Sequence, residues 1–96
     1  MIIELQKFGT TLISRQAGRE AFSAFSATLQ GVPPTEILMA DFQGVLTFSP
    51  SWGDEFLTPL QAQLGNRFVL HAIENPSVKA TVEILEKTNG KKFIVQ

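Results

Sequence analysis

Residues Glu36–Phe42 read EILMADF and give the clearest indication of the fold class. They are apolar along most of their length and show no alternation with polar residues. Such a run is typical of a strand buried on both faces, as in a parallel sheet covered by helices. A second run of the same kind, RFVLHAI, spans Arg67–Ile73. We therefore expect two buried strands in a sheet covered by helices.

A helical pattern precedes the first of these strands. Residues 14–31 carry one apolar stripe at steps of four, three and four residues: Gly18, Phe22, Phe25 and Leu29. Ser14 occupies the expected N-cap position. Gly31 and the following Pro33-Pro34 predict the end of this helix.

Two more helices are expected. Residues 50–64 place four apolar side chains on the inner side: Phe56, Leu57, Leu60 and Leu64. Pro59 lies inside this segment, so we expect a kink, or two short helices with Thr58 capping the second. Asn75-Pro76 predicts the start of the last helix, and Thr88-Asn89-Gly90 predicts its end.

Shorter strand-like stretches complete the order: residues 2–8, 11–13, 45–48 and, as a short edge strand or a tail, 92–95. Alternation of strands and helices predicts an α/β fold. We expect a small, single-layer, mostly parallel sheet of four or five strands with alternating helices. At this length, residues 1–96 are expected to form one domain.

The composition excludes several classes of protein. Eight basic and nine acidic residues give a net charge of −1, without the basic patch of a nucleic-acid binder. No cysteine and a single histidine, His71, exclude disulfides and the usual zinc sites, so we expect no metal and no cofactor. No run approaches the roughly 18 apolar residues of a membrane helix. The start, MIIELQKF, is not a signal peptide. We expect a cytoplasmic protein that binds neither nucleic acid nor membrane.

The segment FSPSWGDE, residues 48–55, follows a strand and opens a helix. Loops at the carboxyl ends of parallel strands are the usual functional edge of a sheet. Its serines have two interpretations: helix caps, or a site that another protein modifies. Ser49 followed by Pro50 is a good N-cap with proline at the first helical position. Ser51 followed by Asp54 is similar to a capping box.

Taken in order, several motifs resemble the bacterial STAS-like domains, relatives of the sulfate-transporter and anti-sigma-factor-antagonist domain. The motifs are SRQAGR (14–19), ILMADFQGV (37–45), SPSWGDEF (49–56) and ENPSVKATVEIL (74–85). The resemblance spans about Leu12–Leu85. Its most specific pieces are DFQGV, Asp41–Val45, and S-x-x-D-E, Ser51–Glu55.

The resemblance implies a regulatory domain whose serine, at the start of this helix, is phosphorylated by a partner. That partner would be a serine kinase with a histidine-kinase-like ATPase fold. By position the phosphoacceptor would be Ser51, with Ser49 as the second candidate. Pro50 precedes Ser51 where antagonists have aspartate, and Trp52 follows it where they have a second serine.

Five further residues are candidates for binding a protein partner: Trp52, Asp54, Glu55, Arg15 and Arg19. Tryptophan is enriched at binding hot spots, and we expect Trp52 to be partly buried with one face available. We expect both carboxylates to complement the helix dipole from its first turn. Arg15 and Arg19 are four residues apart, so they share a helix face, and we expect an ion pair with Asp54 or Glu55.

Other classes of function remain open. A small nucleotide-binding protein or a hydrolase would use the same loop, Ser49–Glu55. Ser51, His71 and Asp41 have the residue types of a catalytic triad, but the nucleophile elbow G-x-S-x-G is missing. Phosphate-binding and dinucleotide fingerprints are missing too. A structural subunit would form a homodimer through an exposed edge strand. We favour the non-enzymatic interaction module.

Overall fold

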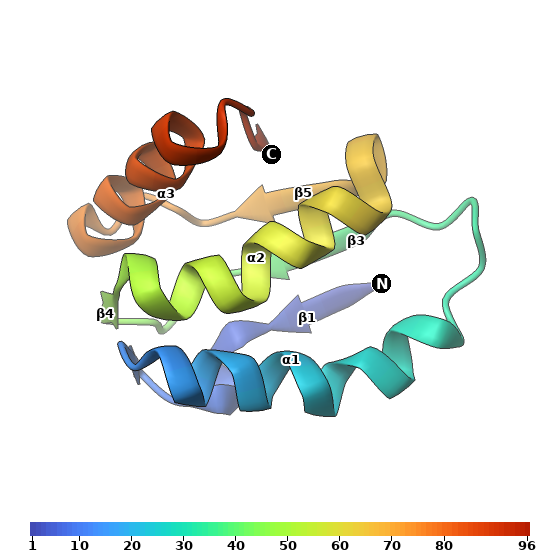
Figure 1. Cartoon of the computed structure of the whole chain (residues 1–96), viewed down its shortest axis with the longest axis horizontal. Helices are drawn as coiled ribbons and strands as arrows, with labels where there is room; N and C mark the ends of the chain where they lie inside the picture. The colour runs from blue at the N-terminus through green and yellow to red at the C-terminus, as the bar shows by residue number, and fades with distance from the viewer.

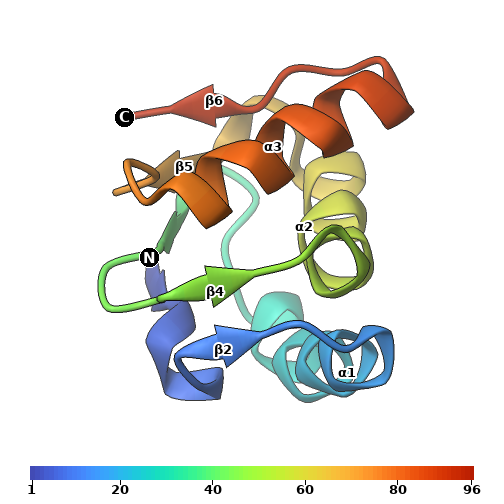
Figure 2. The same ribbon diagram turned by 90° about the vertical axis from the view of Figure 1, so that its left-hand side faces the viewer.

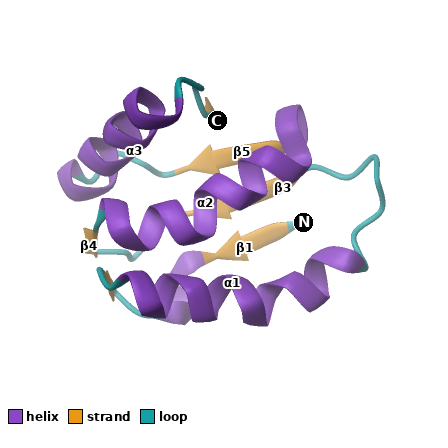
Figure 3. Ribbon diagram, viewed as in Figure 1, coloured by secondary structure: helices purple, strands orange, loops and turns teal.

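The computed structural model describes all 96 residues and shows an α/β fold with three long helices (Figures 1 and 3). The elements in chain order are β1 (Ile2–Glu4), the 3-10 helix η1 (Leu5–Phe8), β2 (Thr11–Leu12), α1 (Arg15–Gln30), β3 (Leu38–Asp41), β4 (Thr47–Phe48), α2 (Pro50–Leu64), the 3-10 helix η2 (Gly65–Arg67), β5 (Phe68–His71), α3 (Pro76–Asn89) and β6 (Ile94–Val95). None of the helices combines the length and the apolar character that crossing a bilayer requires.

Four strands form a parallel sheet in the order β1-β3-β5-β6, and β2 pairs in parallel with β4 beside it. Each new strand of the main sheet is added on the same side of the previous one. Right-handed crossovers, which parallel strands almost always use, then place every connecting helix on one face. Figures 1 and 2 show α1, α2 and α3 on that single face. The mostly parallel sheet predicted from the sequence is confirmed.

The burial of β3 corrects one prediction. Leu38 and Ala40 are completely buried, whereas Met39 and Asp41, which alternate with them, are partly exposed. The expected cover on both faces is therefore wrong for this strand. The reason is the strand order: it never reverses, so no crossover carries a helix to the other face.

One cluster of 21 buried residues fills the space between the sheet and the helices. Phe56 lies at its centre and contacts four other aromatic rings, with centroids 5.0 to 6.3 Å apart: Phe8, Phe22, Phe25 and Trp52. This cluster joins α1, α2 and η1, and it therefore fixes how the amino-terminal ends of α1 and α2 sit beside each other.

The helix ends follow the local sequence. The Ser14 hydroxyl accepts a hydrogen bond from the Ala17 N–H at 3.0 Å. The Asn75 side chain accepts from the Ser77 N–H at 2.7 Å, and Gly90 adopts a left-handed conformation with φ of 66°. Gly can adopt this conformation without the steric cost that other residues incur. The predicted starts and ends of these helices are confirmed.

The helix α2 is continuous from Pro50 to Leu64, so the alternative of two short helices is wrong. Figure 1 shows its axis bending near the middle, in agreement with the expected effect of Pro59. Thr58 does not cap a second helix. Its hydroxyl donates instead to the Asp54 carboxylate one turn earlier, at 3.0 Å.

Side chains of α3 form hydrogen bonds with the backbone of β4, along the edge that does not pair with β2. The Phe48 N–H donates to the Ser77 hydroxyl at 2.9 Å, and the Phe48 carbonyl accepts from the buried Thr81 hydroxyl at 2.7 Å. A strand of only two residues is thereby paired with β2 on one side and with a helix on the other. These bonds hold β4 in place immediately before the loop that opens α2.

Candidate functional site

The amino-terminal ends of α1 and α2 lie side by side, at the end of the molecule toward which the strands point (left in Figure 1). The Ser49 hydroxyl donates to the carbonyl of Ile13, which precedes the N-cap of α1, at 2.6 Å. One turn further along, Gly18 touches the backbone of Trp52: a Cβ atom at Gly18 would lie 2.7 Å from the Trp52 carbonyl oxygen. The two helix starts are therefore held together by a hydrogen bond and by direct backbone contact.

Ser49 and Ser51 have different structural roles. Ser49 is the N-cap of α2, because its oxygen also accepts from the Trp52 N–H at 3.2 Å. Ser51 is the second residue of the helix and is partly exposed. The Ser51 hydroxyl forms no hydrogen bond within the chain, and since every fully buried side-chain oxygen has a partner, this hydroxyl is at least partly accessible to solvent. The capping box predicted for Ser51 and Asp54 is therefore wrong, and Ser49 alone supplies the cap.

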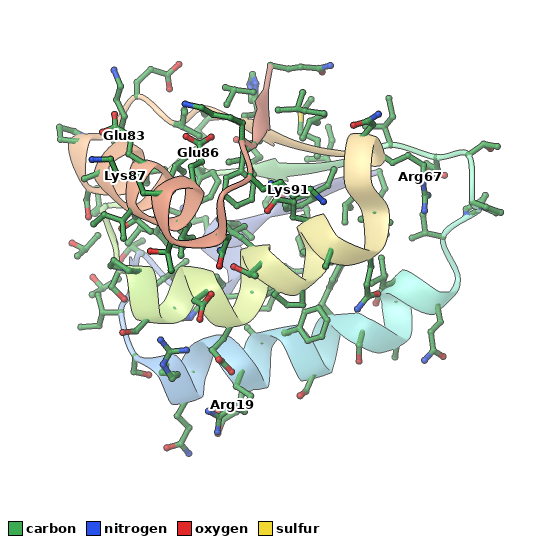
Figure 4. All side chains as sticks on the ribbon, turned by 45° about the horizontal axis from the view of Figure 1, so that its top comes forward. Arg19, Arg67, Glu83, Glu86, Lys87 and Lys91 are labelled. Carbon is green, nitrogen blue, oxygen red and sulfur yellow. The ribbon has the colours of Figure 1, made fainter.

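Arg15, Arg19, Asp54 and Glu55 form one arginine–carboxylate cluster between the helices. Arg15 Nη1 lies 3.1 Å from Asp54 Oδ2 and 2.9 Å from Glu55 Oε2. Arg19 Nε lies 2.9 Å from Glu55 Oε1. The expected ion pairs are confirmed, and they link α1 to α2. Figure 4 shows Arg19 on the surface of α1.

The position of the carboxylates in α2 differs from the prediction. The helix begins at Pro50, so Asp54 and Glu55 fall in its second turn, and the first turn contains no acidic residue. The helix dipole acts within the first turn. The carboxylates therefore do not complement the dipole as expected, and their role is to pair with Arg15 and Arg19.

The cluster shifts the ionisation of its members in the direction expected for ion pairs. Hydrogen bonds from Arg19 and then Arg15 hold the pKa of Glu55 below its ordinary value of 4.5, against the opposing effect of desolvation. Hydrogen bonds to Asp54 and Glu55 raise the pKa of Arg15. The Arg15 side chain is 48% exposed, so water and salt screen these pairs. Each of these exposed pairs therefore contributes little to the stability of the fold.

The prediction that one face of Trp52 stays available to a partner is wrong. Trp52 is only 1% exposed. Its ring packs against Phe8, Phe48 and Phe56, with centroids 5.0 to 5.9 Å apart. The side chain of the third helical residue points into the core here, where aromatic rings from η1, β4 and α2 surround it.

Ile13 is a surface residue of this region that the sequence analysis did not single out. It is 51% exposed, although it is a large apolar side chain directly before an N-cap. An apolar residue at that position usually packs against the fourth helical residue. In α1 the fourth residue is Gly18, which offers no side chain. That pairing of isoleucine with glycine is the sequence signal for an exposed apolar side chain beside Ser49.

The triad residues are not brought together. His71 Nδ1 lies 2.7 Å from the Gln96 carbonyl oxygen, and Asp41 Oδ1 accepts from the Gln43 N–H at 3.0 Å. No hydrogen bond joins either of them to Ser51. Residues 49–55 line none of the surface hollows of the protein. No group of three His, Cys, Asp or Glu side chains is arranged to hold a metal ion.

The order of the strands explains why no ligand-binding crevice forms at the carboxyl ends of the strands. In open α/β sheets, ligands bind in the crevice where the strand order reverses. The order β1-β3-β5-β6 has no such reversal. No family model, no curated protein and no solved structure matches the chain. The candidate site is therefore defined by the residues around Ser51 alone.

Proposed function

We propose that the chain is a non-enzymatic regulatory module of a bacterial signalling or partner-switching system, and that it binds a protein partner through the start of α1 and α2. This interaction surface consists of Ile13, Arg15, Arg19, Ser51, Asp54 and Glu55. The observation that carries the proposal is the free hydroxyl of Ser51 in the first turn of α2, next to a cap that Ser49 already completes. The resemblance of residues 49–56 to STAS-like domains supports the same residue.

Ser51 is the proposed phosphoacceptor. A serine kinase with a histidine-kinase-like ATPase fold would transfer the γ-phosphoryl group of ATP to Ser51 Oγ, which loses its proton as ADP leaves. The product carries about −1.5 to −2 charges at neutral pH. Backbone N–H groups in the first helical turn favour an anion at this point. Ser49 is unsuited to this role because its hydroxyl holds α2 and Ile13 together.

Phosphorylation of Ser51 would change the charge distribution of the surface, because charged side chains lie next to Ser51. Asp54 and Glu55 stand three and four residues after Ser51, on the same side of the helix. A phosphate there would repel both carboxylates and compete with them for Arg15 and Arg19. The surface would then present a different arrangement of charges to a partner, and opposed like charges strongly disfavour association. The absence of cysteine is consistent with the proposed cytoplasmic location, where ATP is present.

Affinity purification from the native host tests this proposal. Tagged wild-type chain, Ser51→Ala, Ser51→Glu and the control Ser23→Glu are compared by quantitative mass spectrometry. Ser23 is an exposed serine of α1 outside the proposed surface, so the control adds the same charge elsewhere. We expect a partner that is retained by Ser51→Ala and Ser23→Glu and lost by Ser51→Glu. Recovery of the same proteins with all four forms would contradict the proposal.

A further inference from the structure

The face of the main sheet that lies away from the helices is uncovered. Figure 2 shows β5 on one side of the molecule and α1 and α2 on the other, and none of the three long helices lies beyond the strands. Alternate residues of a strand point to opposite faces. Since Ile3, Ala40 and Leu70 are buried under the helices, their neighbours in each strand point to the uncovered face.

An apolar patch runs across this uncovered face. The strand register aligns four of its side chains in one row: Ile2, Met39, Val69 and Ile94. Ile37 stands two residues before Met39 and extends the patch. Ile2 is 64% exposed, Ile37 49% and Ile94 38%, while Val69 is buried between its neighbours. The exposed side chains of the row therefore lie at the two edges of the face, on β1 and β6, with the partly exposed Met39 and the buried Val69 between them. Large exposed apolar side chains that gather on one face often mark a binding surface.

Two carboxylates border the apolar patch. Glu4 and Asp41 are register partners in β1 and β3, two residues beyond Ile2 and Met39. Like charges directly opposite each other on neighbouring strands are destabilising. None of the five ion pairs in the structure includes either residue, and Asp41 accepts a hydrogen bond from the Gln43 N–H instead. His71 is next in the row, and the strand residues of this face include neither lysine nor arginine.

We propose that the uncovered face docks an amphipathic helix of a partner protein, with leucine-like side chains on the apolar patch and a lysine or arginine over Glu4 and Asp41. The spacing suits this arrangement. Two residues along a strand span about 6.6 Å. One turn of helix rises about 5.4 Å, so a cation one turn beyond an apolar anchor reaches the carboxylates. The strands of a second copy would bring two more carboxylates, and its Arg67, two residues before Val69, is already bonded to the carbonyls of Pro33 and Glu36.

The test uses two synthetic helical peptides of about five turns, with the same leucine stripe and either lysine or glutamate beside it. Binding to the isotope-labelled chain is followed by amide chemical shifts. We expect the lysine peptide to bind and to shift amides of β1, β3 and β5, with no comparable effect of the glutamate peptide. The double variant Glu4→Gln/Asp41→Asn should weaken binding by roughly fivefold or more, as expected for losing two partly exposed charge pairs.

The matched control is Glu20→Gln/Glu83→Gln, which removes two exposed carboxylates from α1 and α3 and should leave binding unchanged. Equal binding of both peptides, or shifts confined to the helices, would overturn the proposal. So would a dimer in analytical ultracentrifugation that Ile2→Asp converts to monomer, because a second copy would then cover the face. Ser51→Glu should not alter peptide binding. The result for the uncovered sheet face is therefore independent of the result for Ser51.

Discussion

Gly18 of α1 lies directly against the backbone of Trp52 of α2: a Cβ atom at Gly18 would be 2.7 Å from the Trp52 carbonyl oxygen and 3.0 Å from its Cα. Real side chains almost never come so close, and neither contact atom belongs to a flexible group. The glycine therefore sets the separation of the two helix starts. That separation brings Arg15 within 3.1 Å of Asp54 and within 2.9 Å of Glu55.

Gly18→Ala tests this contact. Alanine favours a helix over glycine by about 1 kcal/mol. Overpacking against a fixed backbone costs about 1 to 3 kcal/mol, so we expect a net loss of stability despite the better helix former. Urea unfolding followed by circular dichroism measures it. Ser23→Ala, an exposed substitution in the same helix, is the control and should not destabilise. A Gly18→Ala variant as stable as the wild type would show that the helices separate easily.

The two serines should differ in their effect on stability. Ser49→Ala removes the N-cap of α2 and the bond to the Ile13 carbonyl, and we expect a loss of about 1 to 2 kcal/mol. Ser51→Ala removes no hydrogen bond, and we expect a change within about 0.5 kcal/mol. Chemical denaturation of both variants checks the pair. A larger loss for Ser51→Ala than for Ser49→Ala would reverse the assigned roles.

Glu55→Gln should make the stability less dependent on pH in the acid range. The folded pKa of Glu55 is depressed, so its contribution is present above its ordinary value of 4.5. That contribution is lost as the pH falls through the folded pKa. The wild type should therefore be more stable than Glu55→Gln at neutral pH, and the difference should shrink in acid. Urea midpoints across this range provide the measurement. A difference that persists in acid would exclude the ion pairs as its cause.

The difference in stability between the wild type and Glu55→Gln should also shrink in high salt at neutral pH, because the arginine side chains of the cluster are largely exposed and screened. Glu20→Gln serves as the matched control, since Glu20 pairs with no arginine. It should show neither the pH dependence nor the salt dependence of Glu55→Gln.

Thr81→Val tests how α3 holds β4. Valine has nearly the same shape, but it cannot donate to the Phe48 carbonyl, whose second donor is the Ser77 hydroxyl at 3.2 Å. We expect a loss of about 1 kcal/mol, the net value of one hydrogen bond. Thr88→Val, at an exposed position of the same helix, should change stability by less. Hydrogen exchange at the Thr47 amide, which donates to the Thr10 carbonyl, should also quicken in Thr81→Val if β4 loosens.

The helices could be predicted because their signals are local. Ser14, Asn75 and Gly90 act on the turn in which they stand, and the structure places them as caps. Pro50 at the first helical position also indicates Ser49 as the N-cap, which excludes Ser51 from that role. Local sequence signals were therefore sufficient to locate the start of α2, which carries the candidate site.

Other features depend on residues far apart in the chain. The uncovered face of the sheet follows from the strand order, which no single stretch encodes. The burial of Trp52 depends on rings that include Phe8, 44 residues earlier by the numbering, and Phe48 of β4. The apolar run at 36–42 was misleading because a partly exposed Met39 looks the same in sequence as a buried one.

The proposed role of Ser51 can be tested by mapping phosphate, with tandem mass spectrometry, on the chain purified from its native host. The account predicts that part of the population carries one phosphate on Ser51. It also predicts that Ser51→Ala abolishes this species without a new phosphate on Ser49. An unmodified chain under every growth condition sampled, or a phosphate on another residue that persists in Ser51→Ala, would contradict the account.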